Sequence, residues 1–83
     1  MATDGRVVFR KWRNGDIIAL MVDIPWDEYG HVTSYEHIGQ HGAASYYLVQ
    51  AHTTAAKPAE YADLMRELVS IGYDLKPVAR WQR

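Results

Sequence analysis

The feature that most constrains the fold is the dipeptide Asn14-Gly15, which separates two runs of β-branched and aromatic residues. A type I′ turn requires positive φ at both of its central residues, and Asn followed by Gly tolerates that conformation best. We therefore expect a β-hairpin over residues 6–22, with Asn14 and Gly15 as a two-residue loop. In that register one face of the hairpin would carry Val7, Phe9, Ile18, Leu20 and Val22. The other face is also rich in apolar residues, so we expect something to cover it in part.

The middle of the chain predicts a loop and then two more strands. Residues 23–30 combine proline, glycine and acidic residues with two aromatics, which is typical of a loop. Residues 31–51 predict two strands that a tight turn at residues 39–42 connects. For residues 43–51 a short helix is the alternative, because periodicity does not distinguish a helix from a strand in so short an apolar run.

The last third of the chain predicts one helix followed by a strand. Residues 58–71 begin with a proline, carry acidic residues near the start and repeat apolar residues along one stripe, which is typical of an amphipathic helix. Gly72 supplies the residue that ends such a helix. Residues 73–81 alternate as in a strand, and Pro77 places that strand at an edge. The expected fold class is therefore α+β, an antiparallel sheet in the order ββββαβ with a single helix covering one face.

Composition and charge predict one small domain, residues 1–83, with no strong preference for a charged partner. The chain has 83 residues, of which 48% are apolar, and its net charge is −1. This argues against binding to nucleic acid or anionic membranes through overall charge. Because there is no cysteine, disulfides, thiolate nucleophiles and cysteine-based zinc sites are excluded. The N-terminus resembles neither a signal peptide nor a membrane span, and we expect a soluble cytoplasmic protein with no membrane partner.

The four histidines are the residues most able to carry chemistry. His37 and His41 would share one face of a helix and could then bind a metal, but Gly39 and Gly42 disfavour a helix there. Either histidine could also act as a base, and a small histidine-based enzyme or ligand binder is therefore an alternative. The sequence contains no nucleophile elbow, P-loop or His-Glu-x-x-His motif. We expect no enzyme activity, no catalytic residues, no metal site and no cofactor.

Large aromatic residues favour a protein that binds another protein. The chain has more tryptophan and tyrosine than one small core needs, and these side chains are frequent anchors at interfaces. The residues that we expect to contact a protein partner are Trp12, Trp26, Tyr29, His37, Gln40 and His41. A homodimer formed through the sheet is a further alternative, because it would cover the second apolar face of the hairpin.

Nucleic acid is the alternative partner, because the N-terminal segment is basic although the whole chain is not. The residues that would bind it are Arg6, Arg10, Lys11, Arg13 and Arg80. Cations close to aromatic rings can bind phosphates and stack bases. Arginine and lysine on a hairpin also keep an exposed strand soluble, however, and the acidic middle of the chain would repel nucleic acid.

Three segments of the chain resemble a group of short uncharacterised bacterial and phage-type proteins. They are residues 8–20, which include Phe9-Arg10-Lys11-Trp12 and Ile18-Ala19-Leu20, residues 34–46, which include Gly39-Gln40-His41-Gly42, and residues 60–73. The similarity spans most of the chain. It implies an intracellular protein of bacterial or phage origin, and for a phage protein we expect modulation of a host protein. The resemblance implies no catalytic residues.

Overall fold

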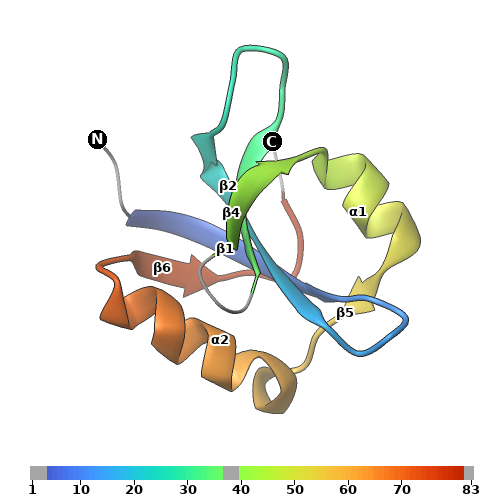
Figure 1. The fold of residues 1–83 in the computed structure, drawn as a ribbon, viewed down its shortest axis with the longest axis vertical. Coiled ribbons are helices and arrows are strands. Elements are labelled where there is room, and N and C mark those ends of the chain that lie inside the picture. The colour runs from blue at the N-terminus through green and yellow to red at the C-terminus, as the bar shows by residue number, and fades with distance from the viewer. Residues whose placement is uncertain (1–3, 37–39, 82–83) are drawn as a thin grey trace.

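The computed structural model describes residues 4–36 and 40–81, with Gln40 described by its backbone alone. Within these residues the chain forms six strands and two helices (Figure 1). In chain order they are β1 (Asp4–Lys11), β2 (Ile17–Pro25), β3 (Val32–Glu36), β4 (Gln40–Ala44), α1 (Tyr46–His52), β5 (Thr54–Ala55), α2 (Pro58–Ser70) and β6 (Asp74–Pro77). The α+β class is confirmed.

All of the strands belong to one sheet, with the order β4-β3-β2-β1-β5 and with β6 also paired to β1. Strands β1 to β4 pair antiparallel in sequence order. The turn predicted at residues 39–42 is wrong from Gln40 onward, because residues 40–44 form β4 and pair with β3. β5 and β6 share the outer edge of β1, where β5 pairs with Arg10 and Lys11 and β6 pairs with residues 4–7. β6 runs parallel to β1, in contrast to the fully antiparallel sheet that we expected. The reason is that α2 carries the chain back along the sheet before β6 begins (Figure 1).

The hairpin turn is one residue longer than predicted. Trp12 donates its amide to the carbonyl of Asp16 (2.8 Å), so three residues lie between them. Gly15 adopts φ 96°, the positive angle that ends a three-residue hairpin loop. Phe9 consequently pairs with Ala19, whereas a two-residue loop at Asn14-Gly15 would pair it with Leu20. Because side chains alternate along a strand, this shift moves every side chain of β2 to the opposite face relative to β1.

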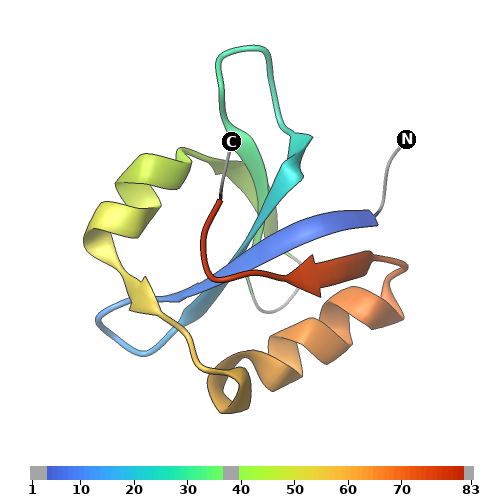
Figure 2. The same ribbon diagram turned by 180° about the vertical axis from the view of Figure 1, so that it is seen from behind.

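Both faces of the sheet are buried, each beneath one helix. The core beneath α2 consists of Val7, Phe9, Ala19, Met21, Tyr35, Leu64, Leu68 and Leu75. The core beneath α1 consists of Val8, Ile18, Leu20, Val22, Val32, Ala44, Tyr46 and Val49. Figures 1 and 2 view the molecule from opposite sides, and both views show the two helices. The second apolar face of the hairpin is therefore covered within the chain and needs no second copy to bury it.

α1 lies where the sequence favoured a strand over residues 43–51. Tyr46 and Val49 are buried, whereas Tyr47 and Leu48 are exposed. This spacing of three residues belongs to a helix, since a strand would bury alternate residues. The helical alternative is thus the correct one from Tyr46 onward, and packing against the second face of the sheet decides between the two.

α2 follows its local sequence closely, and its bounds lie within one residue of those predicted. Gly72 adopts φ 108° just beyond the helix, and the amide of Tyr73 donates to the carbonyl of Leu68 (3.1 Å). β6 is shorter than the predicted strand over residues 73–81. Of the helices in the described part of the chain, none is long and apolar enough to cross a membrane.

Candidate binding surfaces

The loop between β2 and β3 extends away from the sheet (Figure 1) and carries two exposed aromatic residues. Trp26 is 49% exposed and Tyr29 is 80% exposed. The amide of Trp26 donates to the carbonyl of His31 (2.9 Å), which closes the loop at its base. The loop is therefore fixed at both ends while its two largest apolar side chains face solvent.

Asp27 stabilises this loop from within. Its Oδ1 accepts hydrogen bonds from the amides of Tyr29 (2.9 Å) and His31 (3.3 Å), and its Oδ2 lies 2.8 Å from Nδ1 of His31. Desolvation raises the pKa of Asp27, but the hydrogen bonds from Tyr29 and His31 outweigh that effect and hold the pKa below its usual value. The ionised carboxylate therefore holds the loop backbone in place.

A hollow of about 460 Å³ lies beside Trp26. Its lining residues come from β2, β3, β4 and the segments that follow β2 and α2, and they are Asp23, Ile24, Pro25, Trp26, Thr33, His41 and Tyr73. We call Tyr29 and these lining residues the loop surface. Apolar walls with a few polar groups are typical of sites that bind an apolar side chain or a small molecule.

His41 forms part of the wall of this hollow. Its Nε2 lies 2.9 Å from the hydroxyl oxygen of Tyr73, and its ring meets Tyr35 edge-on with 4.7 Å between the ring centroids. Tyr35 in turn donates its hydroxyl to the carboxylate of Glu67 on α2. These contacts connect β4 to α2 and to the segment that follows it, so His41 stabilises the shape of the loop surface.

Asp23, on another side of the hollow, is bound by Arg6. Nη2 of Arg6 lies 2.6 Å from Oδ1 of Asp23, and Nε lies 2.9 Å from Oδ2, which also accepts the Arg6 amide (2.8 Å). The side-chain hydrogen bonds from Arg6 are the main cause that lowers the pKa of Asp23 to about 2. A Cβ on Gly5 would lie only 2.9 Å from Cβ of Asp23, so this close approach requires glycine.

The structure brings together only part of the set that we expected to bind a protein. The members that lie on the loop surface are Trp26, Tyr29 and His41. Trp12 is partly buried and packs against the core beneath α1. His37 lies outside the described residues, and of Gln40 only the backbone in β4 is described.

Arg10, one of the cations expected to bind nucleic acid, caps the end of α1 instead. Its Nε donates to Oγ1 of Thr53 (2.9 Å). Its Nη2 donates to the carbonyl of Thr53 (2.7 Å) and to the carbonyl of Gln50 (3.3 Å). These hydrogen bonds satisfy carbonyls that the last turn of a helix leaves without partners.

The other expected cations are spread over the molecule. Arg6 lies at the loop surface, whereas Lys11, at the opposite end of β1, forms an ion pair with Glu60. The hydrogen bond from Lys11 is the main cause that lowers the pKa of Glu60. Arg13 and Arg80 are exposed and form no hydrogen bond or ion pair with the described chain. The five cations therefore do not form one continuous surface.

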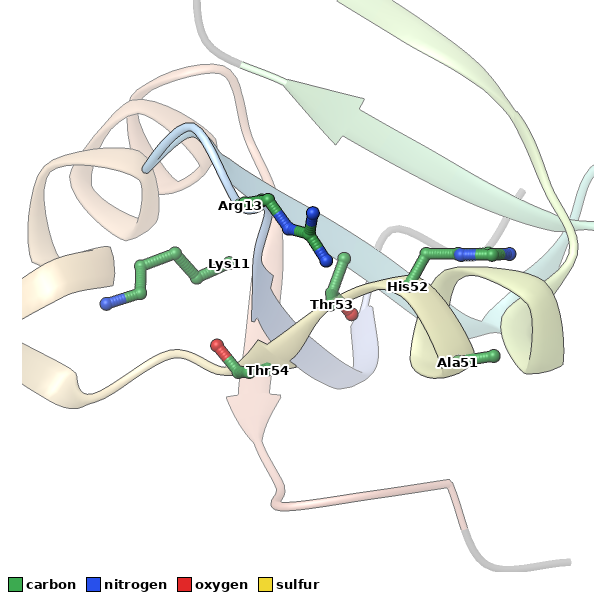
Figure 3. A pocket seen from close by; sticks show the side chains of 6 residues that line it. All are labelled: Lys11, Arg13, Ala51, His52, Thr53 and Thr54. Carbon is green, nitrogen blue, oxygen red and sulfur yellow. The ribbon is translucent and has the colours of Figure 1, made fainter.

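A second hollow, of about 570 Å³, lies between the hairpin and the end of α1 (Figure 3). It is lined by Lys11, Arg13, Ala51, His52, Thr53 and Thr54, and we call it the basic pocket. The sequence pointed to Lys11 and Arg13 but not to residues 52–54. Only the pairing of β5 with β1 brings those residues to the hairpin, and no local pattern indicates that pairing.

In residues 4–36 and 40–81, no three histidine or carboxylate side chains are grouped so as to hold a metal ion. Comparison of the chain with protein-family models, with curated proteins and with solved structures finds no match. The functional proposal therefore depends on the chemistry of the loop surface and the basic pocket.

Proposed function

We propose that this chain is a small accessory protein that binds a protein partner through the loop surface. The observation that supports this most is the exposure of Trp26 and Tyr29 on a loop that its own hydrogen bonds fix in place. Tryptophan and tyrosine often dominate the binding energy of protein interfaces, because each buries a large rigid area. A loop that is already ordered also loses little conformational entropy on binding.

Other exposed apolar side chains favour binding less strongly than the loop does. They are Tyr47 and Leu48 on α1 and Val69 and Ile71 at the end of α2. Leucine and valine are under-represented among the residues that dominate binding at interfaces. The loop surface alone combines a tryptophan with an adjoining hollow that could accept a side chain of the partner.

The charge around the loop surface indicates the chemistry of the partner. Asp27 and Glu28 lie in the loop itself, and the one cation that adjoins the described loop surface, Arg6, is paired with Asp23. Complementary charge across an interface increases the association rate and the specificity. The matching partner is therefore a segment that places an apolar side chain in the hollow and a lysine or arginine beside the loop.

Nucleic acid has less support as a partner, because Arg6, Arg10 and Lys11 are each engaged within the chain. A phosphate backbone would have to compete with these internal contacts. The bacterial or phage origin, the cytoplasmic location and the modulation of a host protein belong to the same proposal and rest on the motif resemblance.

The experiment compares capture of proteins from a nuclease-treated bacterial lysate by three tagged forms of the chain. They are the wild type, the double variant Trp26→Ala/Tyr29→Ala, and Leu48→Ala, a matched control whose side chain is 64% exposed on α1. We expect a protein that the wild type and the control retain and the double variant loses. With that protein purified, the double variant should bind at least about 30-fold more weakly, as expected for loss of anchor residues.

Full retention of the captured protein by the double variant would overturn the proposal, and so would equal loss in the control. Both variants lose only exposed side chains, so we expect both to fold. Thermal unfolding of each variant separates a lost interface from a lost fold.

A further inference from the structure

The basic pocket offers chemistry that the loop surface lacks. Thr54 of β5 pairs with Lys11 of β1, and this pairing places the end of α1 beside the hairpin. Figure 3 shows the guanidinium of Arg13 extending over Thr53, while the side chain of Lys11 extends in the opposite direction, away from Arg13. Two cations, an imidazole and two hydroxyls therefore line one hollow.

The negative end of α1 does not cancel this positive charge. The last carbonyls of a helix carry partial negative charge. Here Oγ1 of Thr53 donates to the carbonyl of Val49 (2.5 Å), and Arg10 donates to the carbonyls of Gln50 and Thr53. Because these carbonyls already have donors, the end of α1 contributes little repulsion to an anion in the pocket.

The cations of the pocket differ in how far the protein itself engages them. Lys11 forms an ion pair with Glu60, and that carboxylate also accepts the amide of Lys57 (2.9 Å). Arg13 and His52 are exposed, and neither side chain forms a hydrogen bond or ion pair with any described part of the chain. The donors of the Arg13 guanidinium are therefore available to a ligand.

We propose that the basic pocket binds the phosphate group of a small molecule. Arg13 forms the bidentate contact, because a planar guanidinium matches two oxygens of a phosphate. The hydroxyl of Thr54 donates a hydrogen bond, whereas Lys11 contributes less because its ammonium group is paired with Glu60. The volume of the pocket lies within the range of roughly 300–1,000 Å³ that is common for small-molecule sites. This site does not depend on the proposed function of the loop surface.

A small molecule suits the pocket better than a nucleic-acid strand does. A strand requires a row of cations along its backbone and aromatic side chains on which its bases stack. The imidazole of His52 is the one aromatic ring in the described lining, and Arg6 lies toward the opposite end of β1. A single phosphate group requires neither the row of cations nor the stacking rings.

The test is a titration of the ¹⁵N-labelled chain with pyrophosphate at constant ionic strength, followed by amide chemical shifts. We expect shifts centred on Lys11, Arg13 and residues 51–54. Arg13→Gln should weaken binding at least about 5-fold, since it removes the charge-assisted contact. Arg80→Gln is the matched control, because Arg80 is also exposed without a described partner, and it should change binding less than about twofold.

If pyrophosphate shifted the amide signals of the Arg13→Gln variant as strongly as those of the wild type, this proposal would be overturned. The absence of shifts at the pocket in the wild type would also overturn it. A response to a single-stranded oligonucleotide without one to pyrophosphate would also overturn it and would indicate a nucleic-acid surface. The Trp26→Ala/Tyr29→Ala variant should bind pyrophosphate as the wild type does. The failure of either proposal is therefore distinguishable from the failure of the other.

Discussion

The two ends of β1 use arginine in different ways. Near the start of the strand, Arg6 binds both carboxylate oxygens of Asp23 and stabilises the sheet beside the loop surface. Near the other end, Arg10 caps α1, whereas Arg13 just beyond the strand has no partner in the described chain. The same residue type therefore stabilises the fold at two positions and is available to a ligand at the third. Cations that are neighbours in the sequence do not define a binding site until the pairings of the fold are known.

The largest effect on stability is expected at Arg10. Arg10→Ala removes three hydrogen bonds and leaves the carbonyls of Gln50 and Thr53 without these donors at the partly buried end of α1. We expect the free energy of unfolding to fall by about 2–3 kcal/mol, measured by urea denaturation. Arg66→Ala is the control, since Arg66 pairs with Asp63 on an exposed face of α2, and it should cost less than about 0.5 kcal/mol. Equal costs for the two variants would contradict the capping role.

The next largest effect is expected at Gly5, beside the Arg6–Asp23 pair. Gly5 adopts φ 149°, and an alanine Cβ there would crowd Cβ of Asp23 at 2.9 Å. Gly5→Ala should therefore lower the free energy of unfolding by about 1–2 kcal/mol in thermal unfolding. Gly30 also adopts a positive φ, but an alanine Cβ there would meet no described atom within 4 Å. Gly30→Ala should therefore lower the free energy of unfolding less than Gly5→Ala does. If both variants cost the same, the close approach to Asp23 has no energetic consequence.

The parts of the fold that could be predicted depend on residues close together in the sequence. The hairpin follows from the Asn14-Gly15 signal, and α2 follows from its apolar stripe and from Gly72. The register of the hairpin was not predicted correctly, because Asn-Gly favours a two-residue loop and the structure has a three-residue loop that ends at Gly15. The helical conformation of α1 and the parallel pairing of β6 depend on packing between segments that are far apart in the sequence.

In the candidate sites, too, local sequence predicts some features, whereas others depend on contacts between distant segments. The exposure of Trp26 and Tyr29 could be predicted, because proline, glycine and acidic neighbours mark a loop. The partial burial of Trp12 could not, since it follows from the packing of α1 on that face of the sheet. The basic pocket could not be predicted either, because only the pairing of β5 with β1 brings Thr54 beside Lys11.

A smaller, pH-dependent effect is expected from Asp23. Its pKa in the folded protein is about 2, below its ordinary value of 3.8. The pair with Arg6 therefore stabilises the fold above about pH 4, and this stabilisation is lost as the pH falls toward about 2. Screening by solvent keeps the contribution below about 1 kcal/mol. Asp23→Asn should therefore be less stable than the wild type at pH 7, and the difference in melting temperature should shrink at pH 3 and below. A difference that stays constant with pH would contradict the charged pair.

The smallest effect on stability is expected at Arg13, and it sharpens the comparison between the two ends of β1. Because its exposed side chain forms no hydrogen bond or ion pair with the described residues, Arg13→Gln should change the free energy of unfolding by less than about 0.5 kcal/mol while it weakens pyrophosphate binding. Lys11→Gln is the contrast, since it breaks the ion pair with Glu60 and should lower both stability and binding. Urea denaturation and the pyrophosphate titration measure the two quantities on the same samples. If Arg13→Gln destabilised the fold as much as Lys11→Gln does, Arg13 would belong with the structural cations, and the end of β1 would hold no arginine free to bind a ligand.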